Sequence, residues 1–191
     1  MRYIEVRRHT MRHKPGKHLT QAGVELARRV GNEMGPFARV LTSKLPRAFE
    51  TAIAMGFAVD DEVKELSLMT DKAGDQMMAA ETNTLADYAR AIHDHKALGR
   101  WAVKQAKYWR SVADALQEGE CALLVSHGGM MELGTVAALP EADHAAWGPG
   151  YSYCEGVRLS YDGNAFVHAE ILRVPLKQPA TRQEPPGART V

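Results

Sequence analysis

Basic and imidazole side chains stand at the points where three predicted strands end. Each belongs to the loop between an apolar run and a predicted helix: Arg8 and His9 after 3–6, Arg47 after 37–43, and His127 after 121–126. In open parallel sheets, ligands bind outside the carboxyl ends of the strands. If the three strands are parallel neighbours, two imidazoles and two guanidiniums meet at one place.

The residue types in these loops suit a phosphate group. Two guanidiniums without an obvious carboxylate between them offer forked donors that match the oxygens of a tetrahedral dianion. The run "SHGG", which precedes a predicted helix, adds backbone N–H groups and the positive end of a helix dipole. We therefore predict a phosphate cradle at this edge of the sheet, with Ser43 and Gly128 beside the charged groups.

The two imidazoles suit different parts of a phosphoryl transfer. An imidazole beside cations is held neutral, because its protonation would add a third like charge. A neutral ring nitrogen has a lone pair that can attack phosphorus. His9 stands at the very end of a buried strand and is the better candidate for the nucleophile. His127 then serves as a second donor to the phosphoryl oxygens.

Four short motifs occur in a specific order along the chain: "VRRHT", "LTQAG", "TSKLPRAFETA" and "VSHGG". Over roughly residues 2 to 174, they resemble the histidine phosphatase superfamily, which has the phosphoglycerate-mutase-like fold. In that family a His becomes phosphorylated, two Arg and a second His bind the phosphate, and a carboxylic acid protonates the leaving group. The resemblance implies these roles for His9, for Arg8 and Arg47, and for His127.

The resemblance also implies where the acid lies. The leaving oxygen needs a proton from a carboxyl group near the pocket. In the family this group follows the helix of the second Arg and a short strand, and Glu65 in "VKELSL" fits best. Asp60, Asp61 and Glu62 are nearby alternatives.

Thr10 departs from the family pattern, which has Gly after the first His. Glycine lets the backbone approach phosphate closely, whereas a β-branched residue tolerates positive φ poorly. Either the loop keeps a conformation open to L-residues and Thr10 contributes its hydroxyl to the phosphate, or phosphate affinity falls. The family also often has an Asn near position 15, and Arg12, His13 or Lys14 could replace its contact.

Five Lys or Arg and three His crowd into positions 7 to 18. One interpretation is a solvated, disordered loop; the other is a rim that steers polyanionic substrates into the pocket. A zinc site is disfavoured, because structural zinc usually needs four closed ligands with Cys among them, and neither cysteine lies near these histidines. We therefore predict no metal and no cofactor.

Composition limits the remaining possibilities. A chain of 191 residues is long enough for one substantial core. The formal net charge of +1 gives no global field that would favour nucleic acid or a membrane as partner. The sequence has two cysteines, no signal-type apolar stretch and no apolar run of about 18 residues. These features predict a cytoplasmic, reduced protein.

Strands alternate with helices along the chain. Predicted strands lie at 3–6, 37–43, 57–66 and 121–126, and a hairpin at 156–174 turns at Asp162–Asn164. Predicted helices lie at 20–34, 46–55, 84–96, 100–118 and 128–139, while 66–83 is predicted as a loop with at most a helical turn. The fold prediction is a three-layer α/β sandwich, with a mostly parallel central sheet and helices on both faces.

The combined prediction is one domain over residues 1–174 and a Pro-rich flexible tail at 175–191. Its function is predicted as metal-independent hydrolysis of a small phosphorylated molecule through a phosphohistidine. Three alternatives stay open: a phosphoglycerate-mutase-like phosphotransferase, a catalytically weak protein that binds a phosphorylated ligand, and a basic-loop RNA binder.

Overall fold

Strands from distant parts of the chain form one central sheet. The computed structural model describes residues 1–175, and within that range the strand order is β3-β2-β4-β1-β5-β6. The strands are β1 (Arg2–Arg8), β2 (Arg39–Ser43), β3 (Asp61–Val63), β4 (Cys121–Ser126), β5 (Gly156–Tyr161) and β6 (Phe166–Leu172). The first four in spatial order are parallel, and β5 and β6 add an antiparallel hairpin.

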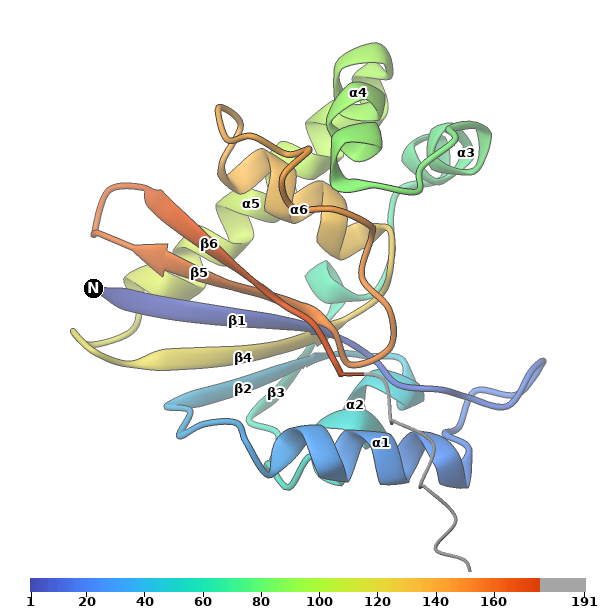
Figure 1. Cartoon of the computed structure of the whole chain (residues 1–191), viewed down its shortest axis with the longest axis vertical. Helices are drawn as coiled ribbons and strands as arrows, with labels where there is room; N and C mark the ends of the chain where they lie inside the picture. Colours follow the sequence, from blue (N-terminus) through green and yellow to red (C-terminus); the bar gives the residue numbers. More distant parts are fainter. Residues whose placement is uncertain (176–191) are drawn as a thin grey trace, which may run out of the picture.

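Helices cover both faces of this sheet. They are α1 (Gln21–Gly31), α2 (Pro46–Ala54), α3 (Asp71–Ala79), α4 (Leu85–Asp94), α5 (Lys96–Asp114) and α6 (Met130–Ala138), with a 3₁₀ turn at Lys64–Leu66. Figure 1 shows α1 and α2 on one face, and α5 and α6 on the other with α3 and α4 outside them. The predicted three-layer α/β architecture is confirmed.

Local sequence signals place most element ends. The side chain of Thr20 accepts a hydrogen bond from the Gly23 N–H and caps α1, as predicted. Pro46 begins α2, and Gly56 follows it at a φ of +97°. In the hairpin turn, Oδ1 of Asp162 accepts the N–H groups of Asn164 and Ala165. These ends set the lengths of the loops that carry the candidate site.

Three predictions of the elements were wrong. The strand predicted at 57–66 covers only Asp61–Val63, and the 3₁₀ turn at Lys64–Leu66 follows it. Helix α1 ends at Gly31, four residues before the predicted stop at Gly35, and its last residue packs on the backbone of Met55 just after α2. A Cβ at Gly31 would lie 2.0 Å from the Met55 carbonyl oxygen. The segment 66–83, predicted as a loop, contains α3, which Thr70 caps by accepting the Ala73 N–H.

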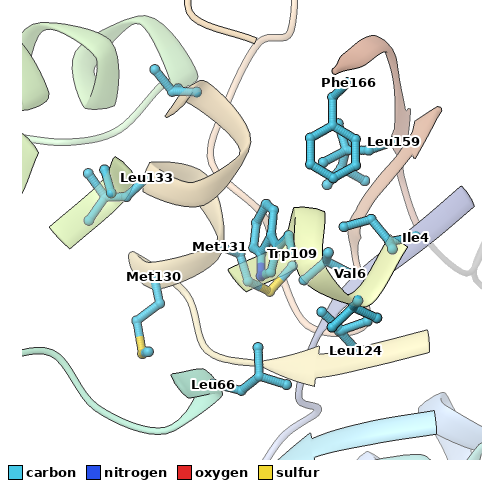
Figure 2. Packing of buried hydrophobic residues seen from close by; sticks show 14 of the residues in the cluster. Ile4, Val6, Leu66, Trp109, Leu124, Met130, Met131, Leu133, Leu159 and Phe166 are labelled. Carbon is cyan, nitrogen blue, oxygen red and sulfur yellow. The ribbon is translucent and has the colours of Figure 1, made fainter. Parts of the chain in front are cut away.

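The central strand β4 is buried on both faces. Leu124 belongs to the large core on the side of α5 and α6, whereas Leu123 and Val125 pack with α2. A strand that is covered on both sides reads as one continuous apolar run, as "CALLV" does. Figure 2 shows Leu124 in the same cluster as Trp109 of α5. This packing fixes the position at which β4 ends and the loop with His127 begins.

The predicted tail at 175–191 lies, apart from Pro175, outside the described residues. Within residues 1–175, no helix is long and apolar enough to cross a membrane.

Candidate active site

Three strands deliver their last residues to the same edge of the sheet. Arg8 at the end of β1 pairs with Ser126 at the end of β4, and β2 runs parallel on the other side of β4. The ring centroids of His9 and His127 are therefore only 5.1 Å apart. Arg8, His9, Arg47 and His127 come together here, and we call these four residues the His–Arg cluster.

Hydrogen bonds fix the tautomer of His9. Its Nδ1 lies 2.6 Å from the carbonyl oxygen of Thr10, which can only accept, so Nδ1 carries the ring proton. Arg47, in the first turn of α2, donates its Nε–H to Nε2 of His9 at 3.1 Å. The lone pair of Nε2 consequently faces a guanidinium.

Both imidazoles of the cluster are neutral near pH 7. Burial lowers the pKa of His9 to about 4, against the hydrogen bond to Thr10, and the charges of Arg47 and Arg8 lower it further. Burial also lowers the pKa of His127 to about 3, again with help from the charge of Arg47. The neutral state expected from the sequence therefore has two causes, and burial is the larger one.

Ser43 contacts His127 at the end of β2. The Ser43 Oγ accepts the Leu45 N–H at 3.2 Å and lies 2.7 Å from Nε2 of His127. The hydroxyl keeps a second lone pair as well as its proton, so it can donate to Nε2 or accept from Nε2–H. In the first case the ring proton sits on Nδ1, which is buried and has no partner within the described part of the chain. Ser43 thus holds the ring of His127, and a proton on Nδ1 would be free for a ligand.

The Arg8 guanidinium is held by contacts that leave donors unused. Its Nη1 donates to the Tyr151 carbonyl oxygen at 2.5 Å, and Cζ lies 5.1 Å from the ring centroid of Tyr153. Its Nε is buried and has no partner among residues 1–175. No described carboxylate forms an ion pair with Arg8 or with Arg47. Two guanidiniums therefore keep donors for an external anion.

Gly128 has a role that the sequence did not indicate. A Cβ at this position would lie 2.8 Å from Cζ and 2.9 Å from Nε of Arg8. Only a residue without a side chain lets the guanidinium lie against this loop. The sequence motif suggested Gly128 as a backbone donor, whereas the structure makes it the surface on which Arg8 packs.

Thr10 is fully buried at the start of the loop after β1. Its N–H donates to Oγ1 of Thr51 at 3.1 Å, and its hydroxyl donates to the Gly23 carbonyl oxygen at 3.1 Å. Cys154 is the one non-glycine residue with positive φ in the described chain, so Thr10 has a backbone conformation open to L-residues. The Thr10 hydroxyl therefore ties the loop to α1.

Glu65 stands in the 3₁₀ turn after β3 and is half-buried. Burial raises the pKa of Tyr108 on α5 to about 12, and the charge of Glu65 raises it further. No hydrogen bond or ion pair of the described residues joins the Glu65 carboxylate to the His–Arg cluster. Of the alternatives, Asp60 accepts the Val40 N–H through Oδ2, while Asp61 and Glu62 are exposed.

A second carboxyl group, Glu132, was missed by the sequence analysis. It is 2% exposed, and its oxygens accept the Gly129 N–H at 2.6 Å and the Tyr151 N–H at 2.9 Å. Burial raises its pKa, while these hydrogen bonds and the charge of Arg8 oppose that rise. The available signal was its position three residues after Gly129 at the start of a helix, which is the spacing of a capping box.

The basic stretch forms an ordered turn beside the cluster. Arg12 donates from Nη1 to the Gly16 carbonyl oxygen at 2.7 Å, and His18 pairs with Glu50 of α2. Glu50 also accepts the Leu19 N–H at 2.9 Å. Residues 13–18 are exposed, as a solvated loop would be, but these hydrogen bonds give the stretch a defined turn. After burial, the charge of Arg12 is the cause that lowers the pKa of Arg47, so this turn adds positive potential to the site.

Within residues 1–175, no group of three or more His, Cys, Asp or Glu side chains is arranged to hold a metal ion.

Solved structures share this fold at low sequence identity. A phosphoserine phosphatase from Entamoeba histolytica, in complex with 3-phosphoglyceric acid, has a TM-score of 0.60 and 14% identity, over 91% of this chain and 98% of that chain. Bacillus stearothermophilus YhfR has a TM-score of 0.62 and 20% identity, over 90% and 96%. Mycobacterium tuberculosis Rv3214 has a TM-score of 0.56 and 15% identity, over 90% and 96%.

No curated protein sequence matches this chain. A family model does, over residues 5–172, and it describes the histidine phosphatase superfamily (branch 1). The match includes β2 to β6, the second half of β1 and every member of the His–Arg cluster. The chain is therefore a member of the histidine phosphatase superfamily, branch 1.

Proposed function

We propose that the protein hydrolyses small phosphomonoesters through a phosphohistidine on Nε2 of His9. The observation that carries this proposal is the lone pair of Nε2, which faces the Arg47 guanidinium at 3.1 Å inside a group of unpaired phosphate donors. The family supports phosphatase chemistry, and substrates of this kind are supported by two solved neighbours: the E. histolytica enzyme holds 3-phosphoglyceric acid, and a mutant of it holds phosphoserine.

In the first half-reaction, Nε2 of His9 forms a bond to phosphorus while the bond from phosphorus to the leaving oxygen breaks. The ring becomes positively charged, and the Thr10 carbonyl oxygen on Nδ1–H stabilises that charge. Arg8, Arg47 and Nδ1–H of His127 donate to the equatorial oxygens, where negative charge gathers. In the second half-reaction, water attacks phosphorus and the phosphorus–nitrogen bond breaks.

Glu65 is our proposed proton donor to the leaving oxygen and the base for the attacking water. Its turn is anchored beside the cluster, because the Ser126 hydroxyl donates to the Leu66 carbonyl oxygen at 2.9 Å. The carboxyl group must turn from the side of Tyr108 toward the cluster to reach the leaving oxygen. Glu65→Gln should lower hydrolysis of alkyl phosphates far more than that of p-nitrophenyl phosphate, whose leaving group departs without a proton. Equal losses on both substrates would remove Glu65 from this role.

A substrate screen with a trapping step tests the proposal. The panel contains sugar phosphates, nucleotides, phosphoproteins and aryl phosphates, with His9→Ala as the blank. We expect an acid-labile phosphoryl group on the wild-type protein after rapid quenching and none on the variant. Activity should survive EDTA, because guanidiniums supply the positive charge in this scheme. Turnover by His9→Ala at the wild-type rate would refute the mechanism.

We also propose that the protein acts in the cytoplasm. Cys121 and Cys154 are both free thiols, as expected in a reducing compartment.

A further inference from the structure

A cleft of about 530 Å³ adjoins the His–Arg cluster, and Arg8 belongs to both. The cleft is walled by residues of α3, α4, α6 and the segment before β5, among them Met77, Asn83, Tyr88 and Glu132. If the cluster holds the phosphoryl group, this space past Arg8 is open to the organic part of an ester. The charges on its walls therefore bear on which leaving groups fit.

The walls of the cleft carry one cation, the Arg8 guanidinium, and in the proposed mechanism it binds the phosphoryl group. Among the residues that line this cleft, Arg8 alone is positively charged. Its Nη1 is already used by the Tyr151 carbonyl oxygen, so its other donors are what remains for phosphate. A carboxylate or second phosphate on the organic part would find no cationic partner on these walls.

The one acidic residue that lines this cleft is Glu132, and it is held rigidly. Each of its carboxylate oxygens accepts a backbone N–H, from Gly129 and from Tyr151, so the side chain has no freedom to swing away. Burial raises the pKa of this carboxyl group, and the two N–H donors and the charge of Arg8 oppose that rise. Both oxygens act as acceptors in this geometry, which is the arrangement of a carboxylate. Because the group is 2% exposed, water screens its charge weakly.

The charge of Glu132 also acts on Tyr88, which lies on the wall of the cleft formed by α4. Burial raises the pKa of Tyr88 to about 12, and the charge of Glu132 is the next largest cause. A second anion placed between these two walls would meet the same repulsion. Polar neutral groups on the walls, from Thr82, Asn83 and Tyr88, suit hydroxyl and ammonium groups instead.

We infer that the preferred substrates are phosphomonoesters of neutral or cationic alcohols, and that Glu132 disfavours organic parts with a further negative charge. This inference rests on the proposed function and specifies its substrate class. The phosphate side of the site is strongly positive and the leaving-group side is not. An ester with a single anionic end matches that division.

Phosphoethanolamine and phosphoserine form a matched pair for the test, since both carry the ammonium group and only phosphoserine carries a carboxylate. We expect kcat/KM for phosphoethanolamine to exceed that for phosphoserine by about tenfold or more, because like-charge juxtaposition opposes binding. Glu132→Gln keeps the shape and should reduce this ratio several-fold. A ratio is insensitive to the fraction of damaged protein. Equal or better hydrolysis of phosphoserine by the wild type, or an unchanged ratio in Glu132→Gln, would overturn the inference.

A second variant serves if Glu132→Gln does not fold. Asn83 is exposed at the rim of the cleft, and its hydrogen bonds with the described residues are made by its backbone. Asn83→Lys adds the missing cation and should raise kcat/KM for phosphoserine selectively. No selective gain would count against the inference. The phosphoryl adduct formed with p-nitrophenyl phosphate is measured in parallel, because its absence would instead reject the proposed function.

Discussion

Arg47 donates its Nε–H to Nε2 of His9 across 3.1 Å, so a guanidinium and the ring lone pair that we propose as the nucleophile face each other. In the proposed mechanism, a bound phosphoryl group replaces this contact. The guanidinium would then donate to the phosphoryl oxygens, and the lone pair would point at phosphorus.

Replacing Arg47 should therefore weaken catalysis strongly. We expect Arg47→Ala to lower kcat/KM by about 10²- to 10³-fold, because one preorganised donor to the transition state is lost. Arg47→Lys should recover little of this, since an ammonium lacks the planar fork. Steady-state kinetics with an aryl phosphate measure both, and Arg28→Ala on the exposed side of α1 is the matched control. A loss of less than about threefold in Arg47→Ala would contradict the assignment.

Gly128→Ala tests the packing of Arg8. The added Cβ would lie 2.8 Å from Cζ of Arg8, so the guanidinium must move. We expect kcat/KM to fall by about 10²-fold, as displacements near 1 Å cause in catalytic sites. Gly74→Ala in α3 is the control, because a Cβ there meets nothing within 4 Å. Full activity of Gly128→Ala would show that the position of Arg8 is unimportant.

Thr10→Gly asks whether the departure from the family motif impairs the enzyme. The Thr10 hydroxyl bonds the Gly23 carbonyl oxygen, and the backbone here needs no glycine. We expect the free energy of unfolding to fall by about 1–3 kcal/mol, because a buried hydrogen bond is lost and the unfolded chain gains freedom. Activity per folded molecule should not rise, and Thr10→Ser should behave as wild type. A clear gain in kcat/KM for Thr10→Gly would mean that Thr10 limits phosphate binding.

The buried imidazoles should make the protein acid-sensitive. The pKa of His9 is about 4 and that of His127 about 3 in the folded protein, against 6.5 for the free side chain. Below pH 6.5 the unfolded chain binds protons that the folded one does not. Stability is therefore complete above that pH and falls as pH drops from 6.5 toward 4.

Melting temperatures measured between pH 7.5 and 4.5 test this acid sensitivity. The decrease should be smaller in His127→Asn, which removes one of the two groups. His93→Asn, at an exposed position on α4, should follow the wild-type curve. A wild-type melting temperature that stays level across the range would contradict the neutral, buried state of both rings.

Sequence patterns predicted those parts of the site that local signals determine. The strand end at Ser126 follows from an apolar run, whereas β1 continues to Arg8, two residues past the run at 3–6. The helix that contains Arg47 follows from Pro46 and Gly56. The order of the motifs then identified the family, which the match over residues 5–172 confirms.

Contacts between distant residues were beyond the sequence analysis. The role of Glu132 depends on the hydrogen bond from Tyr151, nineteen positions later. The role of Gly128 depends on its contact with Arg8, which lies about 120 positions earlier. Ser43 meets His127 only because β2 and β4 are neighbours. Helix α3 was missed because its sequence "DKAGDQMMA" has a weak apolar period and a central glycine, so that tertiary packing on α5 contributes much of its stability.

The neighbours of β1 have a consequence for synthesis on the ribosome. Tyr3 pairs with Cys121 and Arg8 with Ser126, while the strand on the other side, β5, is made later still. The segment that bears His9 is thus synthesised long before either of the strands that flank it. A nascent chain stalled before β4 should therefore lack an assembled His–Arg cluster, with β1 still unpaired.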